Sequence, residues 1–179
     1  MSTAQLSRML LLGCVTAAVA SCAQVEADVP EATVTKKAVS FQGIPGGSQL
    51  GEVSTTQTFT LTSDDLSWAK SMNAQVYVVE VKFSSVGVDL SFIHDARVIM
   101  ADGAVDSSTP PAEIINYERT GAPIASSELS VKTSYPIDVT KLWASKTIVI
   151  TMQLVGIFPE QAWHADVTLN LGGKISYKL

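Results

Sequence analysis

The sequence predicts an all-β fold: an antiparallel β-sandwich of the jelly-roll or immunoglobulin-like kind, with one or two short helical turns. Three observations lead to this prediction. Several segments alternate apolar and polar residues, glycine- and proline-rich turns separate them, and no segment beyond the N-terminal apolar run has the length and periodicity of an amphipathic helix. The order of the strands does not follow from these features.

Several internal segments are expected to be strands, and three of them show the pattern most clearly. In residues 55–62, threonines occupy one side and Phe59 and Leu61 the other, which predicts a strand with one face in water. Residues 74–84 carry apolar side chains on both faces in their first half, which predicts a central, covered strand. Residues 113–120 have the character of an edge strand.

The C-terminal segment predicts one long strand rather than a hairpin. Odd-numbered positions from Trp163 to Leu179 are mostly apolar, and they share one face only if the chain continues through Gly172 and Gly173. A two-residue turn there would put the apolar residues of the second arm on the wet face. We therefore expect a single strand, bent at the glycines, with Trp163 buried.

Two short helical turns are expected beside the strands. Ser63 precedes two acidic residues and a Leu-Ser-Trp-Ala-Lys segment at 66–70, which is typical of a helix N-terminus. Residues 141–146 have a similar Leu-Trp-Ala pattern before the apolar segment 147–155.

The N-terminus has the composition of a secretory signal. Arg8 precedes an apolar run from Met9 to Ala20, about a dozen residues where a membrane span needs about 20. The sequence therefore predicts three parts: a signal peptide at 1–21, an acidic flexible tether at 22–32, and a single sandwich domain at 33–179.

The four residues Val19-Ala20-Ser21-Cys22 resemble the lipobox of bacterial lipoproteins, in which an aliphatic residue and two small residues precede a cysteine. The resemblance covers only the first 22 residues. It implies cleavage after Ser21, a diacylglyceryl group on the Cys22 sulfur and an N-acyl group on the new amine. Ala23 rather than aspartate at the next position implies sorting to the outer membrane. The alternative is an ordinary secretory signal that leaves Cys22 as a free thiol.

Charge and cysteine content exclude several classes of function. Loss of Arg8 with the signal leaves 11 basic and 17 acidic side chains, a net charge of −6, which argues against nucleic acid as a partner. Cys14 would leave with the signal and Cys22 would be alkylated. The mature chain would then have no disulfide, no cysteine nucleophile and no cysteine metal site.

Candidate chemistry in the remaining chain is sparse, and no cofactor is expected. His164 and Asp166 project from the same side of the last strand, so they could bind a metal or pair with each other. The alternative is that they belong to a solvated row with Thr168 and Asn170, since two ligands do not make a zinc site. No nucleophile-elbow, zinc-protease, phosphate-loop or EF-hand spacing occurs.

Aromatic residues provide the second group of candidates. Trp68, Trp143 and Trp163 lie at strand ends or in turns, and Phe158 lies in a loop beside Trp163. If exposed, they would suit stacking on a sugar or contact with a protein. The alternative is that they close the ends of the hydrophobic core.

These observations favour an acyl-anchored protein of the cell envelope, without enzymatic activity, whose sandwich binds or scaffolds a protein or a glycan. Two other hypotheses remain open. One is an envelope glycan hydrolase, whose paired carboxylates would meet only in the folded chain. The other is a carrier with an apolar cavity for a small ligand.

Overall fold

The computed structural model describes residues 24–62 and 75–178. Contacts divide the chain into two compact units, one of 1–27 with 176–179 and one of 28–175. The described residues of the first unit are ends of two strands, β1 (Gln24–Phe41) and β8 (Trp163–Lys178). The candidate sites discussed below belong to the second unit.

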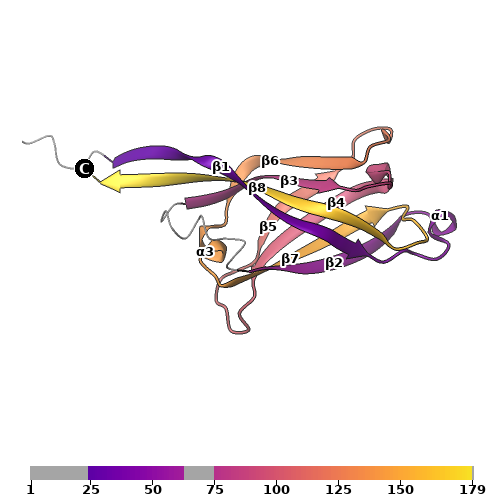
Figure 1. The fold of residues 1–179 in the computed structure, drawn as a ribbon, viewed down its shortest axis with the longest axis horizontal. Helices are drawn as coiled ribbons and strands as arrows, with labels where there is room; N and C mark the ends of the chain where they lie inside the picture. The colour runs from indigo at the N-terminus through magenta and orange to yellow at the C-terminus, as the bar shows by residue number, and fades with distance from the viewer. Residues whose placement is uncertain (1–23, 63–74, 179) are drawn as a thin grey trace, which may run out of the picture. The chain divides into compact units, whose positions relative to one another are not determined.

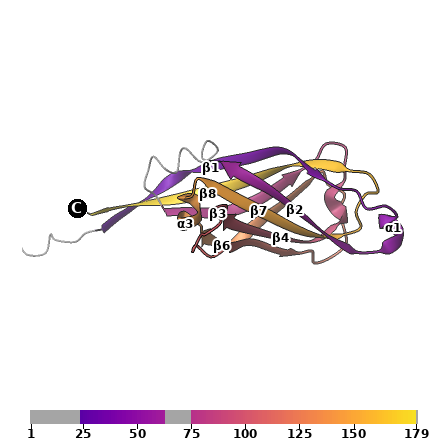
Figure 2. The ribbon, with the colours of Figure 1, turned by 90° about the horizontal axis from the view of Figure 1, so that it is seen from below.

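The second unit is built from two four-stranded antiparallel sheets (Figures 1 and 2). Besides β1 and β8, the strands are β2 (Val53–Thr62), β3 (Gln75–Ser84), β4 (Ile93–Asp102), β5 (Ala112–Glu118), β6 (Glu128–Asp138) and β7 (Thr147–Gly156). One sheet has the order β1-β8-β3-β6 and the other β2-β7-β4-β5.

This strand order identifies the fold as a jelly roll. Successive strands cross from one sheet to the other at every connection except that between β4 and β5, as in an eight-stranded jelly roll of two Greek keys. The predicted antiparallel sandwich is therefore confirmed, and its topology is resolved in favour of the jelly roll over the immunoglobulin-like alternative.

The core lies between the two sheets and is filled by alternate residues of each strand. In β7, the even-numbered residues from Ile148 to Leu154 are fully buried, while the odd-numbered ones are only half-buried. Val78, Val81 and Phe83 of β3 face them from the other sheet and are also fully buried. Period-two alternation thus places one row of each strand in the core and leaves the other row outside.

Most strand predictions are confirmed, including the long C-terminal one. β8 runs without a turn through Gly172 and Gly173, with Trp163 buried as its parity requires. β3 lies inside its sheet, as expected of a central strand, and β5 lies at the edge of its sheet.

The predicted flexible tether at 22–32 is wrong for the residues that the structure describes. β1 begins at Gln24 and continues to Phe41, so residues 24–32 are part of a strand hydrogen-bonded to β8. The physical reason is visible in the sequence, because Val25, Ala27 and Val29 alternate with polar residues. Acidic residues and Pro30 do not prevent strand formation at a sheet edge.

Three short helical turns are present in the described residues. These are α1 (Gly47–Leu50), the 3₁₀ turn η1 (Leu90–Phe92) and α3 (Thr140–Trp143). The turn expected around residues 141–146 corresponds to α3, whereas the one expected at 63–70 lies outside the described residues.

Candidate functional site

Four loops meet at one end of the jelly roll (Figure 1). They are residues 42–52, 85–92, 119–127 and 157–162, and we refer to the surface that they form as the four-loop end. Backbone hydrogen bonds join loop to loop: Ile44 N–H to the Pro159 carbonyl at 2.9 Å, Ile157 N–H to the Phe92 carbonyl at 3.2 Å, and Leu90 N–H to the Ser126 carbonyl at 2.7 Å. The four loops therefore form one connected surface.

An aromatic cluster lies beneath these loops. The Trp163 ring stacks on Phe41 with centroids 4.1 Å apart and planes at 8°. Phe92 meets Trp163 edge-on at 5.3 Å and Phe158 at 5.2 Å. These rings come from β1, β8 and two of the four loops, so their packing holds the loop end in place.

The hypothesis of an exposed aromatic surface is corrected for three of its four residues. Phe158 and Trp143 are each 2% exposed and Trp163 is 3% exposed, because all three side chains close the ends of the core. None of them can stack on a sugar or contact a partner without rearrangement. Trp68 lies outside the described residues.

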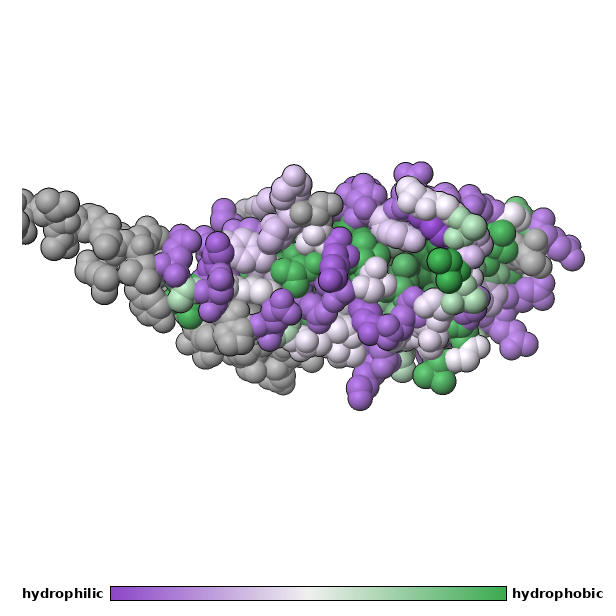
Figure 3. All heavy atoms as spheres, turned by 90° about the horizontal axis from the view of Figure 1, so that it is seen from above, coloured by the Kyte–Doolittle hydropathy of each residue, from purple (hydrophilic) through white to green (hydrophobic). Residues whose placement is uncertain are grey.

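Aliphatic side chains, rather than aromatic ones, are exposed at the four-loop end. Each loop carries one: Leu50 is 62% exposed, Val86 100%, Ile124 83% and Ile157 47%. The space-filling view shows hydrophobic surface mixed with polar surface, including at the end where the loops lie (Figure 3). The sequence gives no sign of these residues, because exposure at a loop tip leaves no periodic signal.

The charge of the four-loop end is acidic. Glu52, Asp89 and Glu160 are exposed there, and the one basic side chain in the four loops is Arg119. The Arg119 guanidinium is half-buried and donates to the backbone carbonyls of Ser91 and Ile93. Its charge is therefore directed inward, and the outer surface presents carboxylates beside aliphatic groups.

A surface hollow of about 490 Å³ lies where the loops join the β1-β8-β3-β6 sheet. Its lining includes Ser84, Ser85, Glu128, His164 and Asp166. The Ser84 hydroxyl donates to the Glu128 carboxylate at 3.2 Å, and the Ser85 hydroxyl donates to the His164 carbonyl at 2.8 Å. The hollow thus gathers hydroxyl, carboxylate and imidazole groups.

His164 and Asp166 both line this hollow, but the described residues give them no third ligand. Among residues 24–62 and 75–178, no group of three or more His, Cys, Asp or Glu side chains could hold a metal. Asp166 has another role, since its Oδ1 accepts a hydrogen bond from the Ala38 N–H at 2.8 Å.

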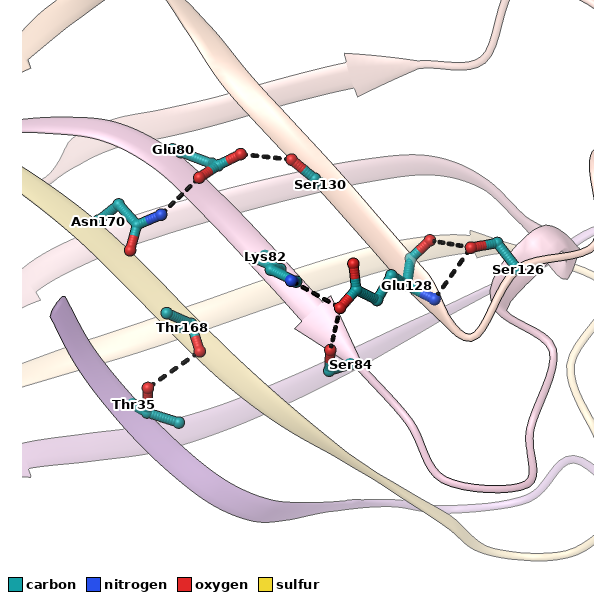
Figure 4. Close-up of polar contacts among 9 residues, drawn as sticks. All are labelled: Thr35, Glu80, Lys82, Ser84, Ser126, Glu128, Ser130, Thr168 and Asn170. Carbon is teal, nitrogen blue, oxygen red and sulfur yellow. Dashed lines mark hydrogen bonds and ion pairs between the residues drawn. The ribbon is translucent and has the colours of Figure 1, made fainter.

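The outer face of the β1-β8-β3-β6 sheet carries rows of polar side chains that cross the strands (Figure 4). In one row, Thr35 and Thr168 share a hydrogen bond at 3.0 Å. Lys82, opposite Thr168 on the neighbouring strand, forms an ion pair with Glu128 at 2.6 Å. The predicted solvated row along β8 is thus part of a wider polar face.

Two carboxylates on this face are held in the ionised form. Hydrogen bonds from the Ser130 hydroxyl and then the Asn170 amide lower the pKa of Glu80 below its ordinary value. A hydrogen bond from the Lys82 ammonium lowers the pKa of Glu128. A general acid for glycoside hydrolysis needs a raised pKa, so neither carboxyl suits that role.

Cys22 and Ala23 lie outside the described residues, so the lipidation site stays a prediction. Within the part of the chain that the structure describes, no helix has the length and apolar character needed to cross a bilayer.

No protein-family model matches this sequence, and no curated protein matches it. Among solved structures, the chain is similar to that of Desmodium yellow mottle tymovirus, with 6% identity, 88% of this chain and 89% of that chain covered, and a TM-score of 0.32. It is also similar to the structure of mud crab tombus-like virus, with 8% identity, 97% of this chain and 98% of that chain covered, and a TM-score of 0.33. For the decameric BFDV capsid protein the identity is 9%, 85% of this chain and 99% of that chain are covered, and the TM-score is 0.28. At these scores the fold assignment rests on the strand order alone: the chain is an eight-stranded jelly roll.

Proposed function

We propose that this chain is an acyl-anchored protein of the cell envelope, sorted to the outer membrane, whose jelly roll binds or scaffolds a protein partner through the four-loop end. The anchor is supported by the lipobox-like residues ending at Cys22. Two or more acyl chains would give a stable attachment to the bilayer, whereas one chain gives a marginal attachment.

The observation that carries the binding proposal is one exposed aliphatic side chain on every loop of the four-loop end. Burying a valine, leucine or isoleucine fully is worth roughly 1.5–3 kcal/mol, so several together could supply much of the affinity of a protein contact. The loop-to-loop hydrogen bonds reduce the entropy lost on binding, because the surface is already ordered.

The acidic groups beside the aliphatic ones indicate the kind of partner. A partner surface that combines apolar side chains with lysine or arginine would complement Glu52, Asp89 and Glu160. A negatively charged membrane surface would be repelled by the same carboxylates.

The direction of β1 supports this assignment of the binding end. Within the 28–175 unit, the strand runs from Asp28 to Phe41, where the chain enters the four-loop end. At about 3.3 Å per residue this is about 40 Å of extended chain. The loops therefore lie at the opposite end of this stretch of β1 from Asp28, the residue of this unit that is nearest to Cys22 in the sequence.

A glycan partner is the second candidate, and the hollow near His164 favours it. Hydroxyl, carboxylate and imidazole groups in one hollow could form hydrogen bonds with sugar hydroxyls. The buried positions of Trp143, Phe158 and Trp163 weigh against the aromatic stacking that many sugar sites use. Among the described residues, the side chains that the two sheets direct toward each other are buried, which does not favour a small-ligand carrier.

The anchor is tested by metabolic labelling with a fatty-acid analogue. The wild-type chain should incorporate the label and Cys22→Ala should not. Equal labelling of both would remove the lipoprotein proposal.

The binding surface is tested by recovering partners from detergent-solubilised envelopes. A Val86→Asp/Ile124→Asp variant should recover the partner at least about tenfold less than wild type, since charge in an apolar contact costs more than 1.4 kcal/mol. Val105→Asp is the matched control, because Val105 is also fully exposed but lies in the β4–β5 loop. Equal recovery by all three chains would contradict the assignment of the four-loop end. Loss of recovery only in His164→Ala would favour the hollow.

A further inference from the structure

We propose that the open edge of β2 pairs with the same edge of a second copy of this chain, forming a two-fold symmetric dimer with one continuous eight-stranded sheet. β2 ends its sheet, and within the described residues its one strand neighbour is β7. An open edge presents unpaired backbone N–H and C=O groups, which are a template for another strand. This inference does not depend on the proposed function.

β1, an edge strand of the other sheet, has features that oppose pairing with another chain. Lys36 and Lys37 lie in β1, and Ala38 has a positive φ of 51° that interrupts regular extended geometry. Proteins use charges and backbone irregularities of this kind to prevent a strand edge from pairing with other chains. β1 therefore has protection against edge pairing.

The remaining two edges have protection of the same kind. β5 carries Glu113 and Glu118 and follows two prolines, and its pairing with β4 contains a register shift. β6 carries Lys132 and Pro136, and its pairing with β3 is also shifted. Proline removes a donor from the edge, and a bulge twists the edge away from a flat partner.

β2 lacks every one of these features. Its sequence from Val53 to Thr62 contains no charged residue and no proline. Its pairing with β7 continues without a register shift from Val53–Gly156 to Thr62–Thr147. β2 is therefore a ten-residue, regular, uncharged edge in a fold whose other three edges are protected.

The sequence of β2 is complementary to itself in the antiparallel direction. A two-fold axis at Gln57 would place hydroxyl residues opposite each other on the exposed face and larger side chains opposite each other on the inner face. The pairs would be Ser54 with Thr60 and Thr56 with Thr58 outside, and Thr55 with Phe59 and Gln57 with itself inside. Cross-strand threonine pairs and aromatic–β-branched pairs are favourable, and no like charges would meet.

This pairing would also limit the assembly to two chains. It uses the open edge of each copy once, and the combined sheet would then end at β5 in both copies. Because β5 is protected by charge and proline, growth would stop at two chains rather than continue into a fibre. A second copy is therefore the partner that this edge fits.

The test uses single cysteines in the full-length chain in intact cells, with mild oxidation and non-reducing electrophoresis. Gln57→Cys would lie opposite itself across the axis, with Cβ atoms about 4.5–5.5 Å apart, a separation that a disulfide can bridge with small adjustment. Asn116→Cys, exposed on the β5 edge, is the matched control. The unsubstituted chain controls for Cys22. A covalent dimer of Gln57→Cys alone is the expected result.

A second variant tests the pairing without a crosslink. Thr58→Lys would bring two lysines together near the axis, and it should lower the dimer fraction of the detergent-solubilised protein at least about tenfold, measured by sedimentation. Asn116→Lys should leave the dimer fraction unchanged. The proposal is overturned if the wild-type protein sediments as a monomer, if Asn116→Cys crosslinks as readily as Gln57→Cys, or if folded Thr58→Lys remains dimeric. Should Thr58→Lys fail to fold, the cysteine pair decides.

Discussion

The indole ring of Trp163 lies flat against the phenyl ring of Phe41, joining the first residue of β8 to the last residue of β1. The two residues are far apart in the sequence, and their contact closes the core beneath the four-loop end. Both side chains are buried, and Trp163 also meets Phe92 edge-on. The position of the candidate binding surface therefore depends on the packing of a few rings.

Trp163→Ala should destabilise the protein by about 3–5 kcal/mol, because it removes a large buried ring and leaves a cavity. Chemical denaturation would measure this. Trp163→Phe should recover much of the loss, since it restores an aromatic contact and removes a buried indole N–H that has no hydrogen-bond partner among the described residues. Val86→Ala, fully exposed in the same part of the fold, is the control and should change stability by less than about 0.5 kcal/mol. A small effect of Trp163→Ala would contradict the role of the cluster.

Gly156→Ala should disrupt the same end of the fold. A Cβ at Gly156 would lie 2.0 Å from the Phe92 carbonyl oxygen, so β7 and the loop before β4 would have to separate. We expect a loss of at least about 2 kcal/mol in denaturant unfolding, as is usual for overpacking against backbone.

Gly172→Ala is the matched control for this substitution. Its Cβ would meet a Val79 side-chain atom at 3.6 Å, which is ordinary contact. It should therefore cost well under half as much as Gly156→Ala. Equal effects of the two substitutions would mean that the close approach of β7 and the loop does not determine stability.

The alternation of apolar and polar residues made the faces of single strands predictable, but not the burial of loop residues or the order of the strands. The burial of Trp163 and the continuity of β8 follow from parity, which one strand contains by itself. Phe158 lies in a loop without parity, so its burial depends on Phe92 from a distant loop. Strand order is equally non-local, because it depends on which strands pair in space.

The wrong prediction of a tether and the failure to find the exposed aliphatic residues have different physical causes. Acidic residues and Pro30 are common in linkers and predict a tether at 22–32, yet the described part of this segment, 24–32, is compatible with an edge strand. The exposed aliphatic residues of the four-loop end could not be found, since a lone valine in a loop gives no sign of whether the fold buries it. Only the assembled loops place Val86 and Ile124 in water.

Glu80 should make stability depend on pH in a specific direction. The Ser130 hydroxyl and the Asn170 amide lower the pKa of its carboxyl in the folded state, so the stabilisation is present above the ordinary value of 4.5 and is lost as the pH falls through the folded pKa. Wild type should therefore melt at a higher temperature than Glu80→Gln at pH 7, and this difference should shrink below about pH 4.5.

A Ser130→Ala/Asn170→Ala variant separates hydrogen bonding from charge in this experiment. It keeps the Glu80 carboxylate and removes both donors, which are the two largest causes of the lowered pKa, so the pKa should move back toward its ordinary value and the pH-dependent component should become smaller. A difference between wild type and Glu80→Gln that stays constant from pH 7 to pH 3 would contradict this explanation.

Ala38 and Asp166 form the last pair with a testable consequence. Ala38 has a φ of 51°, a left-handed conformation that costs a non-glycine residue about 1–2 kcal/mol, and the Asp166 carboxylate holds it there by accepting the Ala38 N–H at 2.8 Å. Ala38→Gly should therefore raise stability by up to about 1 kcal/mol, whereas Ala38→Val should lower it.

Asp166→Ala should destabilise the wild-type chain by about 1–3 kcal/mol and the Ala38→Gly chain by less, because glycine adopts this φ without strain. Denaturant unfolding of the wild type, Ala38→Gly, Asp166→Ala and the double variant forms a double-mutant cycle that measures this coupling. Additive effects would show that Asp166 does not stabilise the left-handed conformation of Ala38. A rise in melting temperature on adding zinc would instead support Asp166 as a metal ligand.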